Sequence, residues 1–318
     1  MPTYNASRHV GAALESVLNQ TEGDFEFLIY DDGSTDETSD ILRSYEDKRI
    51  HLFRSKENLG YVHWLNAGLE ESQGQFIARM DADDLCDARR FEKQVEAMQA
   101  EPRRVMLGSA VRWIDASGGI IGGKEYPTSL AAILWELCFD NPFCHPTVMM
   151  RREVLQSHGL RYREDLLPSE DYELWTRLVR CGEVINLQDS LLDYRIHEGQ
   201  ISQTKRRQQL LHHDVVVKNH LKRYFGETLN FDEQDCVALR KLWQGALWNE
   251  LDDEIALERV ETCLRVLYGT LTDNLGYDVV RREVLPRLKK LWLRLVAKEP
   301  AGWNKFRLWR VSRRITSL

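Results

Sequence analysis

A run of acidic residues follows an apolar stretch in the first third of the chain. The segment RMDADDLCD, residues 79 to 87, holds four aspartates and comes directly after Phe76-Ile77-Ala78, a sequence typical of a buried strand. Carboxylates this close repel one another unless a cation or a hydrogen-bonded ligand lies among them. A solvated turn is the alternative interpretation, but four acids exceed what a turn needs, which favours a binding site.

The spacing of Asp81 and Asp83 indicates the kind of ligand. Hard oxygen ligands in a D-x-D arrangement select Mg²⁺ or Mn²⁺, and such ions are usually held by one or two carboxylates together with the phosphates of a substrate. A nucleoside diphosphate fits this description. We therefore expect the pair to bind a divalent cation and, with it, a diphosphate.

Two earlier polar segments, TYN at residues 3 to 5 and DDGSTDET at residues 31 to 38, also follow predicted strands. Asp32 can accept a hydrogen bond from a base N–H or a ribose hydroxyl, and Tyr4 offers a ring face on which a base can stack. The second segment also matches a turn and a helix cap, with Ser34 and Glu37 in the spacing of a capping box. From the residues alone both interpretations stay open.

A further acidic pair belongs to a predicted helix in LLPSEDYELWTRLVRCG. The apolar stripe places the start of this helix near Ser169, which puts Glu170 and Asp171 in its first turn. There the helix dipole favours an ionised carboxylate, which in a cleft can act as general base towards a hydroxyl. Acids are also common in first turns for structural reasons alone. Two other segments, NPFCHPTVMM and YRIHEGQIS, each place a histidine beside turn residues, either as a loop residue or as a ligand.

Several other kinds of site are excluded or less well supported. A calcium loop that began at Asp81 would have Leu85 at its fifth position and Cys86 where glycine is required. No GxGxxG follows a predicted strand and no GxxxxGK[ST] occurs, which argues against dinucleotide and Walker-type sites. An aspartyl phosphatase would use a D-x-D after a strand, but it would not explain TYN or DDGSTD.

The predicted elements that carry these segments alternate between strand and helix. Such alternation is typical of an α/β protein with a mostly parallel sheet flanked by helices, whose ligands bind outside the carboxyl ends of the strands. We expect a strand at residues 25–30, a helix after DDGSTDET, a strand at 50–53, a helix at 61–70 and a strand ending at Met80. Because only MPTYN precedes the first turn, we also expect a truncated first strand.

The composition of the chain is typical of a globular protein. Of the 318 residues, 43% are hydrophobic and 29% charged, no apolar run is long enough to span a membrane, and the first residues given do not show the basic-then-apolar signature of a signal peptide. We therefore expect a cytoplasmic protein. Its six cysteines are scattered and should be reduced.

Residues 206–318 form a second region that we expect to be helical, after a first domain at residues 1–205. From Arg287 to the end there are ten basic residues and one acidic residue, interleaved with Trp292, Trp303 and Trp309. This tail is either a solvated basic helix pair with core tryptophans or a surface for anionic lipid at the inner face of a membrane. Since the chain as a whole is acidic, nucleic acid is not an expected partner.

Eight motifs in order carry a resemblance to a known family over about residues 1 to 205. The chain resembles the family-two inverting glycosyltransferases of GT-A fold in PTYN, DDGSTDET, ENLG, GQFIARMDADD, RFEKQV, HPTVMM, SEDYELWTRL and YRIHEGQIS. The resemblance implies a nucleotide-sugar donor, with Mn²⁺ or Mg²⁺ as cofactor and a glycan or lipid-linked acceptor. Among nucleotide sugars, a UDP-sugar is the donor that we expect.

The resemblance also implies a role for individual residues. The positions that match donor-contacting residues of the family are Pro2, Thr3, Tyr4, Asp32, Arg79, Asp81 and Asp83. Asp83 matches the direct metal ligand of the D-x-D motif, Asp81 its partner, and His197 a histidine near the metal and the diphosphate. Asp171 matches the catalytic base.

The function expected from the sequence is sugar transfer to a hydroxyl acceptor in the synthesis of a cell-surface polysaccharide or glycolipid. The alternative is a non-catalytic protein of the same fold that binds nucleotide sugars or serves as a scaffold. Retention of Asp81, Asp83 and Asp171 together favours the enzyme.

Overall fold

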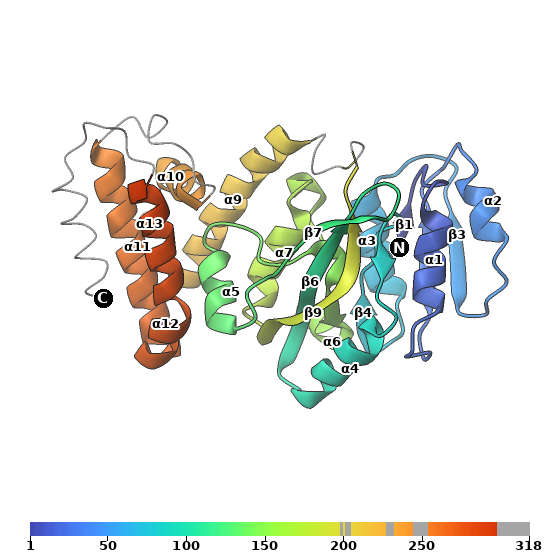
Figure 1. Cartoon of the computed structure of the whole chain (residues 1–318), viewed down its shortest axis with the longest axis horizontal. Coiled ribbons are helices and arrows are strands. Elements are labelled where there is room, and N and C mark those ends of the chain that lie inside the picture. The colour runs from blue at the N-terminus through green and yellow to red at the C-terminus, as the bar shows by residue number, and fades with distance from the viewer. Residues whose placement is uncertain (198–199, 201–204, 227–231, 244–253, 298–318) are drawn as a thin grey trace. The chain divides into compact units, whose positions relative to one another are not determined.

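The computed structural model of the chain is shown in Figure 1. It describes residues 1–197, 200, 205–226, 232–243 and 254–297. The chain divides into two compact units. The first comprises residues 1–128 and 143–209, and the second comprises residues 129–142 and 210–318.

The first unit begins with a parallel sheet of three strands in the order β1-β2-β3. Its strands alternate with helices, as the sequence predicted. The elements in chain order are β1 (Pro2–Thr3), α1 (Val10–Leu18), β2 (Phe27–Asp31), α2 (Thr38–Arg43), β3 (Ile50–Arg54) and α3 (Tyr61–Glu71). The first strand has two residues.

A second, mixed sheet completes the first unit, with β4-β8-β6-β9-β5 as its strand order and β7 paired to β6. Only β6 and β9 run parallel, and the other pairs are antiparallel. Its strands are β4 (Phe76–Ala78), β5 (Leu85–Cys86), β6 (Arg104–Ile114), β7 (Ile120–Lys124), β8 (Met149–Arg151) and β9 (Glu183–Arg195), and its helices are α4 (Arg90–Ala100), α6 (Arg152–Ser157) and α7 (Glu170–Leu178). Two short 3₁₀ helices lie at His145–Thr147 and Glu164–Leu166.

Helix α1 shows how the apolar pattern builds this unit. Val10, Leu14 and Val17 recur at helical spacing, are buried, and pack in one core with Phe27 and Ile29 of β2. Full burial of each such side chain contributes about 1.5–3 kcal/mol. The core thus fixes the first sheet against its helices and holds the strand ends that carry the polar segments.

The second unit is helical, in agreement with the sequence. It contains α5 (Leu130–Glu136), α9 (Arg206–Phe225) from Leu210 on, α10 (Glu233–Trp243), α11 (Glu254–Leu275), α12 (Tyr277–Glu283) and α13 (Leu285–Ala297). Within it, Phe139 stacks on Trp243 with ring centroids 5.1 Å apart. No helix among the described residues has the length and hydropathy needed to cross a bilayer. The basic end of the chain, residues 298–318, lies outside the described residues, so the lipid-surface hypothesis stays a prediction.

One local prediction was wrong. Helix α2 begins at Thr38, and its N-cap, Glu37, makes no side-chain capping bond. Ser34 accepts a hydrogen bond from the Asn5 amide at 3.0 Å instead. The hydroxyl that would have capped the helix therefore joins the loop after β2 to the loop after β1, so the apparent capping box is a contact between strand ends.

Candidate active site

Three carboxylates meet directly after β4. Oxygen atoms of Asp81, Asp83 and Asp84 all lie within 4.8 Å of one another. Asp84 is buried, and its Oδ1 accepts a hydrogen bond from the Arg195 amide at 2.8 Å. Its Oδ2 is also buried and has no hydrogen-bond partner among the described residues. An acceptor oxygen in this position is suited to a cation.

The electrostatics of the cluster agree with that interpretation. Burial raises the pKa of Asp84 well above its ordinary value, and the charges of Asp81 and Asp83 raise it further. Burial also raises the pKa of Asp81, a shift that Arg79 opposes. Three ionised carboxylates at this spacing are therefore costly, and a divalent cation among them would remove most of the cost.

A histidine and an arginine from the end of β9 complete the cluster. The Nε2 atom of His197 lies 2.9 Å from Oδ2 of Asp83. Arg195 is buried and donates from its guanidinium to the carbonyl oxygens of Asp83, at 2.7 Å, and Asp115, at 2.9 Å. The structure thus brings the predicted histidine to the D-x-D segment, across 114 residues of chain.

The donor set fits a hard divalent cation. Carboxylate oxygens and an imidazole nitrogen are ligands of Mg²⁺ and Mn²⁺, and Asp83, Asp84 and His197 can supply them. Asp81 is less free for this role because it forms an ion pair with Arg79. Burial alone would lower the pKa of Arg79, but the charge of Asp81 and the hydrogen bond to it raise that pKa overall. Arg79 thus positions Asp81, whereas its predicted contact with the donor stays a prediction.

The carboxylate of Asp32, at the end of β2, is buried and holds the entrance to α3. It accepts hydrogen bonds from the Leu59 amide at 2.7 Å, the Gly60 amide at 3.0 Å and the Trp64 indole at 2.7 Å. Two of these bonds end on Oδ1 and one on Oδ2. Since an ionised carboxylate offers about four acceptor sites, one remains on Oδ2 for a base or a ribose.

The neighbouring Asp31 holds the other side of the same loop. It is buried, accepts a hydrogen bond from the Ser34 amide at 3.0 Å, and also bonds the hydroxyl of Ser39. In the same loop, Gly33 has a φ of 73°, and a Cβ atom at that position would meet the Glu57 backbone at 2.7 Å. The loop therefore requires glycine.

The segment after β1 presents one exposed ring. Tyr4 is 49% exposed, whereas the preceding Thr3 is buried and its hydroxyl has no hydrogen-bond partner among the described residues. Asn5 accepts a hydrogen bond from the Thr35 amide at 2.9 Å, which ties this segment to the loop after β2. An exposed aromatic ring on a fixed loop can stack against a base. For Pro2 the structure gives only its place at the start of β1.

The predicted start of α7 is confirmed, with Ser169 as N-cap and both acids in the first turn. Their surroundings differ. Glu170 is buried and accepts a hydrogen bond from the Tyr61 hydroxyl at 2.8 Å, and burial raises its pKa to about 7. Asp171 is partly exposed, and its Oδ1 accepts the Tyr172 amide at 2.6 Å. Of the two, Asp171 is the carboxylate that a substrate can reach.

A buried tyrosine connects α7 with the acidic cluster. The hydroxyl oxygen of Tyr162 lies 3.0 Å from Nε2 of His145. Burial raises its pKa, and the charges of Asp171, Glu170 and Asp81 also raise it, while Arg79 lowers it. The acids of the two segments therefore both affect the pKa of this one side chain. Neither Tyr61 nor Tyr162 stood out in the sequence, because a single tyrosine in a loop or a helix has no distinctive pattern.

The bonds of Asp32 lead to a stability prediction. Asp32→Ala would leave two amides and one indole N–H without their acceptor, and we expect a loss of about 3 kcal/mol in the free energy of unfolding. Trp64→Phe removes the indole bond and part of the ring that stacks on Tyr30, but it keeps both backbone bonds to Asp32 and should cost less. Urea unfolding of both variants measures this, and an equal loss in the two would show that the backbone bonds to Asp32 contribute little.

The environment of Glu170 leads to a pH prediction. Its pKa rises from 4.5 to about 7 on folding, so the folded state binds the proton more tightly and the free energy of unfolding falls as pH rises between these values. In Glu170→Gln this fall, on the order of 3 kcal/mol, should be absent. Urea unfolding from pH 4.5 to pH 8 checks it, with the exposed Glu164→Gln as control. Parallel profiles for wild type and Glu170→Gln would contradict the assignment.

Comparison with known sequences agrees with this arrangement. The model of the family "Glycosyl transferase family 2" matches residues 1–159. A similar chain, an uncharacterized glycosyltransferase of Haemophilus influenzae, is 34% identical over 63% of this chain and 65% of its own length, just under two thirds. The O-antigen biosynthesis glycosyltransferase WbnJ of Escherichia coli is 33% identical over 62% of this chain and 78% of its own.

Solved structures share the fold at low sequence identity. TarS of S. aureus, determined in complex with UDP-GlcNAc, has a TM-score of 0.57 at 16% identity and covers 99% of this chain and 89% of its own. The mannosyltransferase PcManGT of Pyrobaculum calidifontis, in complex with GDP-Man and Mn²⁺, has a TM-score of 0.55 at 18% identity over 93% and 84% of the two chains. With the fold and the family model in agreement, the chain belongs to glycosyl transferase family 2.

Proposed function

We propose that this glycosyltransferase uses a divalent cation and transfers a sugar, with inversion, from a nucleotide sugar to a hydroxyl group. The observation that carries the proposal is the group of three carboxylates after β4, with His197 in contact with one of them. We further propose a UDP-sugar as donor and a glycan or lipid-linked acceptor in the synthesis of a cell-surface polysaccharide. Support for this setting comes from WbnJ, whose name refers to O-antigen biosynthesis.

The donor is proposed to lie across the ends of β1, β2 and β4. Its base would stack on the exposed ring of Tyr4, and an N–H of the base or a hydroxyl of the ribose would donate a hydrogen bond to the remaining acceptor site of Asp32. Its diphosphate would lie at the acidic cluster, where Asp83, Asp84 and His197 hold the cation. When bound, the cation neutralises the charge that develops on the departing nucleoside diphosphate.

The proposed catalytic base is Asp171. Its position in the first turn of α7 favours the ionised form, because the helix dipole stabilises a negative charge there. It takes the proton of the acceptor hydroxyl while the oxygen attacks the anomeric carbon from the face opposite the leaving group. The sugar is transferred in a single displacement without a covalent enzyme intermediate, so the configuration at the anomeric carbon inverts. Glu170 is buried and accepts a hydrogen bond from Tyr61, which argues against the same role for it.

The alternative is a protein of this family that binds nucleotide sugars without transfer. The two functions differ in one measurement, the transfer or hydrolysis of a donor in the presence of metal. A screen of nucleotide sugars by thermal shift with Mn²⁺ would first identify the donor, because a ligand that binds the native state raises its stability by mass action.

The first functional prediction concerns the cation. Binding of a nucleoside diphosphate should require a divalent metal, and Asp83→Asn should weaken the metal-dependent part of that binding at least tenfold, since it removes a charged ligand. Calorimetric titration with and without a chelator measures the effect. Asp87→Asn, four residues further along and outside the cluster, should bind as the wild type does. If the affinity for the nucleotide is the same with and without the chelator, the proposed role of the cation is wrong.

The second functional prediction concerns the base. Asp171→Asn keeps the size of the side chain but cannot accept the proton, so donor and metal should bind normally while transfer falls by about 10² to 10⁴-fold. Glu170→Gln should retain far more activity. The assignment is wrong if Asp171→Asn transfers sugar at nearly the wild-type rate, or if Glu170→Gln alone abolishes transfer while donor binding persists.

A further inference from the structure

Helix α3 connects the loop after β2 with the first turn of α7. Its N-cap, Gly60, donates its amide to Oδ2 of Asp32 at 3.0 Å. Its first residue, Tyr61, donates its hydroxyl to Oε1 of Glu170 at 2.8 Å. Because Tyr61 follows Gly60 and Asp171 follows Glu170, the path from Asp32 to Asp171 consists of two hydrogen bonds, each followed by one step along the chain.

The bond between Tyr61 and Glu170 has a fixed donor and a buried acceptor. Burial raises the pKa of Tyr61, and the charge of Glu170 and the hydrogen bond to it also raise that pKa, so the hydroxyl keeps its proton. Glu170 is buried, and its Oε2 atom has no hydrogen-bond partner among the residues that the structure describes. Loss of a bond to a buried carboxylate is costly, so the bond ties α7 firmly to α3.

The first turn of α7 has no side-chain cap that would hold it instead. Its N-cap, Ser169, makes no capping hydrogen bond, and the Ser169 hydroxyl donates to the Gln209 carbonyl at 3.3 Å. The large core side chains of the helix begin at Tyr172, which is buried. Core packing therefore holds α7 from there onward, whereas the turn that carries Asp171 depends on polar contacts such as that of Tyr61.

Helix α3 is a well-fixed support for this contact. Three of its side chains, Val62, Leu65 and Leu69, recur at helical spacing and are buried. In the middle of the helix, the Asn66 amide group donates to the Tyr162 carbonyl at 3.0 Å and accepts from the Tyr162 backbone amide at 2.9 Å. The helix thus holds the segment that leads to α7 as well as the first turn of α7.

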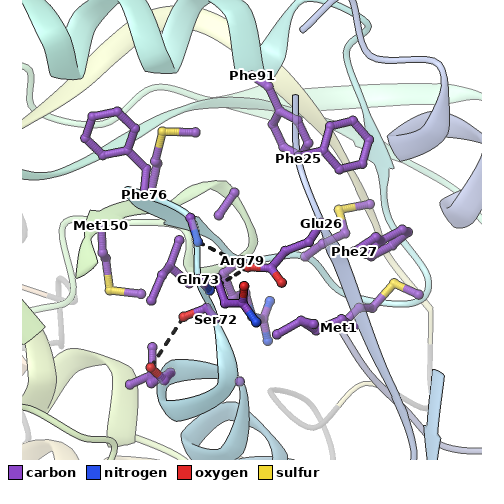
Figure 2. Close-up of a pocket in the computed structure, with 18 of the residues that line it drawn as sticks. Met1, Phe25, Glu26, Phe27, Ser72, Gln73, Phe76, Arg79, Phe91 and Met150 are labelled. Carbon is purple, nitrogen blue, oxygen red and sulfur yellow. Dashed lines mark hydrogen bonds between the residues drawn. The ribbon is translucent and has the colours of Figure 1, made fainter. Parts of the chain in front are cut away.

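The far end of α3 carries a second bond of the same kind. There the Tyr30 hydroxyl donates to Oε2 of Glu71 at 2.8 Å. Directly beyond the helix, the Gln73 amide donates to the Glu26 carboxylate at 2.5 Å, as Figure 2 shows. The helix therefore has a tyrosine–glutamate bond of the same length at each end, and these far-end contacts do not involve α7.

On the basis of the function proposed above, in which Asp171 is the base and Asp32 contacts the donor, we propose that Tyr61 is a positioning residue for Asp171. It holds Glu170, and with it the first turn of α7, at a fixed place relative to the loop that Asp32 binds. A catalytic group must lie within about 0.5 Å of its productive position, because small displacements from it cost much of the rate. Tyr61 acts in this way without a contact to donor or acceptor.

The kinetic test compares Tyr61→Phe with the matched control Tyr30→Phe. Both variants keep the ring and lose one hydrogen bond to a glutamate of known position. In Tyr61→Phe we expect kcat for transfer to fall about tenfold, while KM for the donor and the calorimetric affinity for a nucleoside diphosphate with Mn²⁺ stay as in the wild type. Tyr30→Phe should keep kcat near the wild-type value even if its melting temperature falls as far.

Variants of Glu170 test the same bond from its other side. Glu170→Gln keeps an oxygen that can accept from Tyr61 and should retain most of the transfer rate. Glu170→Leu has no acceptor and should lose about as much as Tyr61→Phe. The double variant Tyr61→Phe/Glu170→Leu should lose no more than either single variant, because both changes remove the same bond.

Hydrogen exchange measures the state of the turn without transfer. The Glu173 amide donates to the Ser169 carbonyl at 3.1 Å, which closes the first turn of α7. This amide should exchange about tenfold faster in Tyr61→Phe and at the wild-type rate in Tyr30→Phe. Unchanged exchange in Tyr61→Phe would overturn the proposal whether or not the protein transfers sugar.

The kinetic results can also overturn it while the proposed function stands. One such result is an active wild type and a Tyr61→Phe variant of equal kcat. Another is an equal fall of kcat in Tyr30→Phe, which would trace the loss to the stability of α3. A third is a loss in Tyr61→Phe that lies entirely in donor affinity, which would make Tyr61 a donor contact. A wild type that neither binds a nucleoside diphosphate nor transfers sugar would contradict the proposed function instead, and the exchange of Glu173 would then decide whether Tyr61 positions the turn.

Discussion

The repulsion among three carboxylates at the end of β4 is the constraint on which the rest of the first unit depends. Each neighbouring element contributes a group that limits it. Arg79 pairs with Asp81 from the same segment, Arg195 at the end of β9 donates its amide to Asp84, and His197 beyond that strand contacts Asp83. These contacts still leave one buried oxygen of Asp84 without a partner among the described residues. The fold therefore assembles a cluster whose charge the described protein groups balance only in part, which agrees with the proposed cation site.

The acids at the end of β2 show that structural and binding roles need not exclude each other. From the sequence, DDGSTD was either a turn or a nucleotide contact. In the structure Asp31 and Asp32 each hold a loop, and Asp32 keeps acceptor capacity on one oxygen. A stacking ring and a single hydrogen-bond acceptor can select a ligand only if their positions are fixed, and rigid loops fix them. The loop after β2 is thus held by its own acids, as the turn interpretation expected, whereas the helix cap that belonged to that interpretation is absent. The contact of Asp32 with a donor stays a prediction.

The predictions that succeeded were local ones. The βαβ order, the bounds of α3 and the N-cap of α7 follow from patterns within a few residues, and the structure confirms them. The pairs that shape the site join residues far apart, with 109 positions between Tyr61 and Glu170 and 111 between Asp84 and Arg195. Periodicity cannot predict such pairs, because it reports which face of an element is buried and not what lies against it. The capping box failed for the same reason, since Ser34 bonds across strands.

The adjacent acids of α7 show how the fold assigns different chemistry to similar side chains. Successive residues on a helix point about 100° apart, so Glu170 and Asp171 cannot share one environment. Glu170 turns towards Tyr61, is buried, and its pKa rises to about 7, so near neutral pH it is in part uncharged. That neutral fraction reduces the repulsion on Asp171, which stays partly exposed in the helix's first turn. A base must be accessible, and of this pair only Asp171 is partly exposed, which agrees with the role proposed for it.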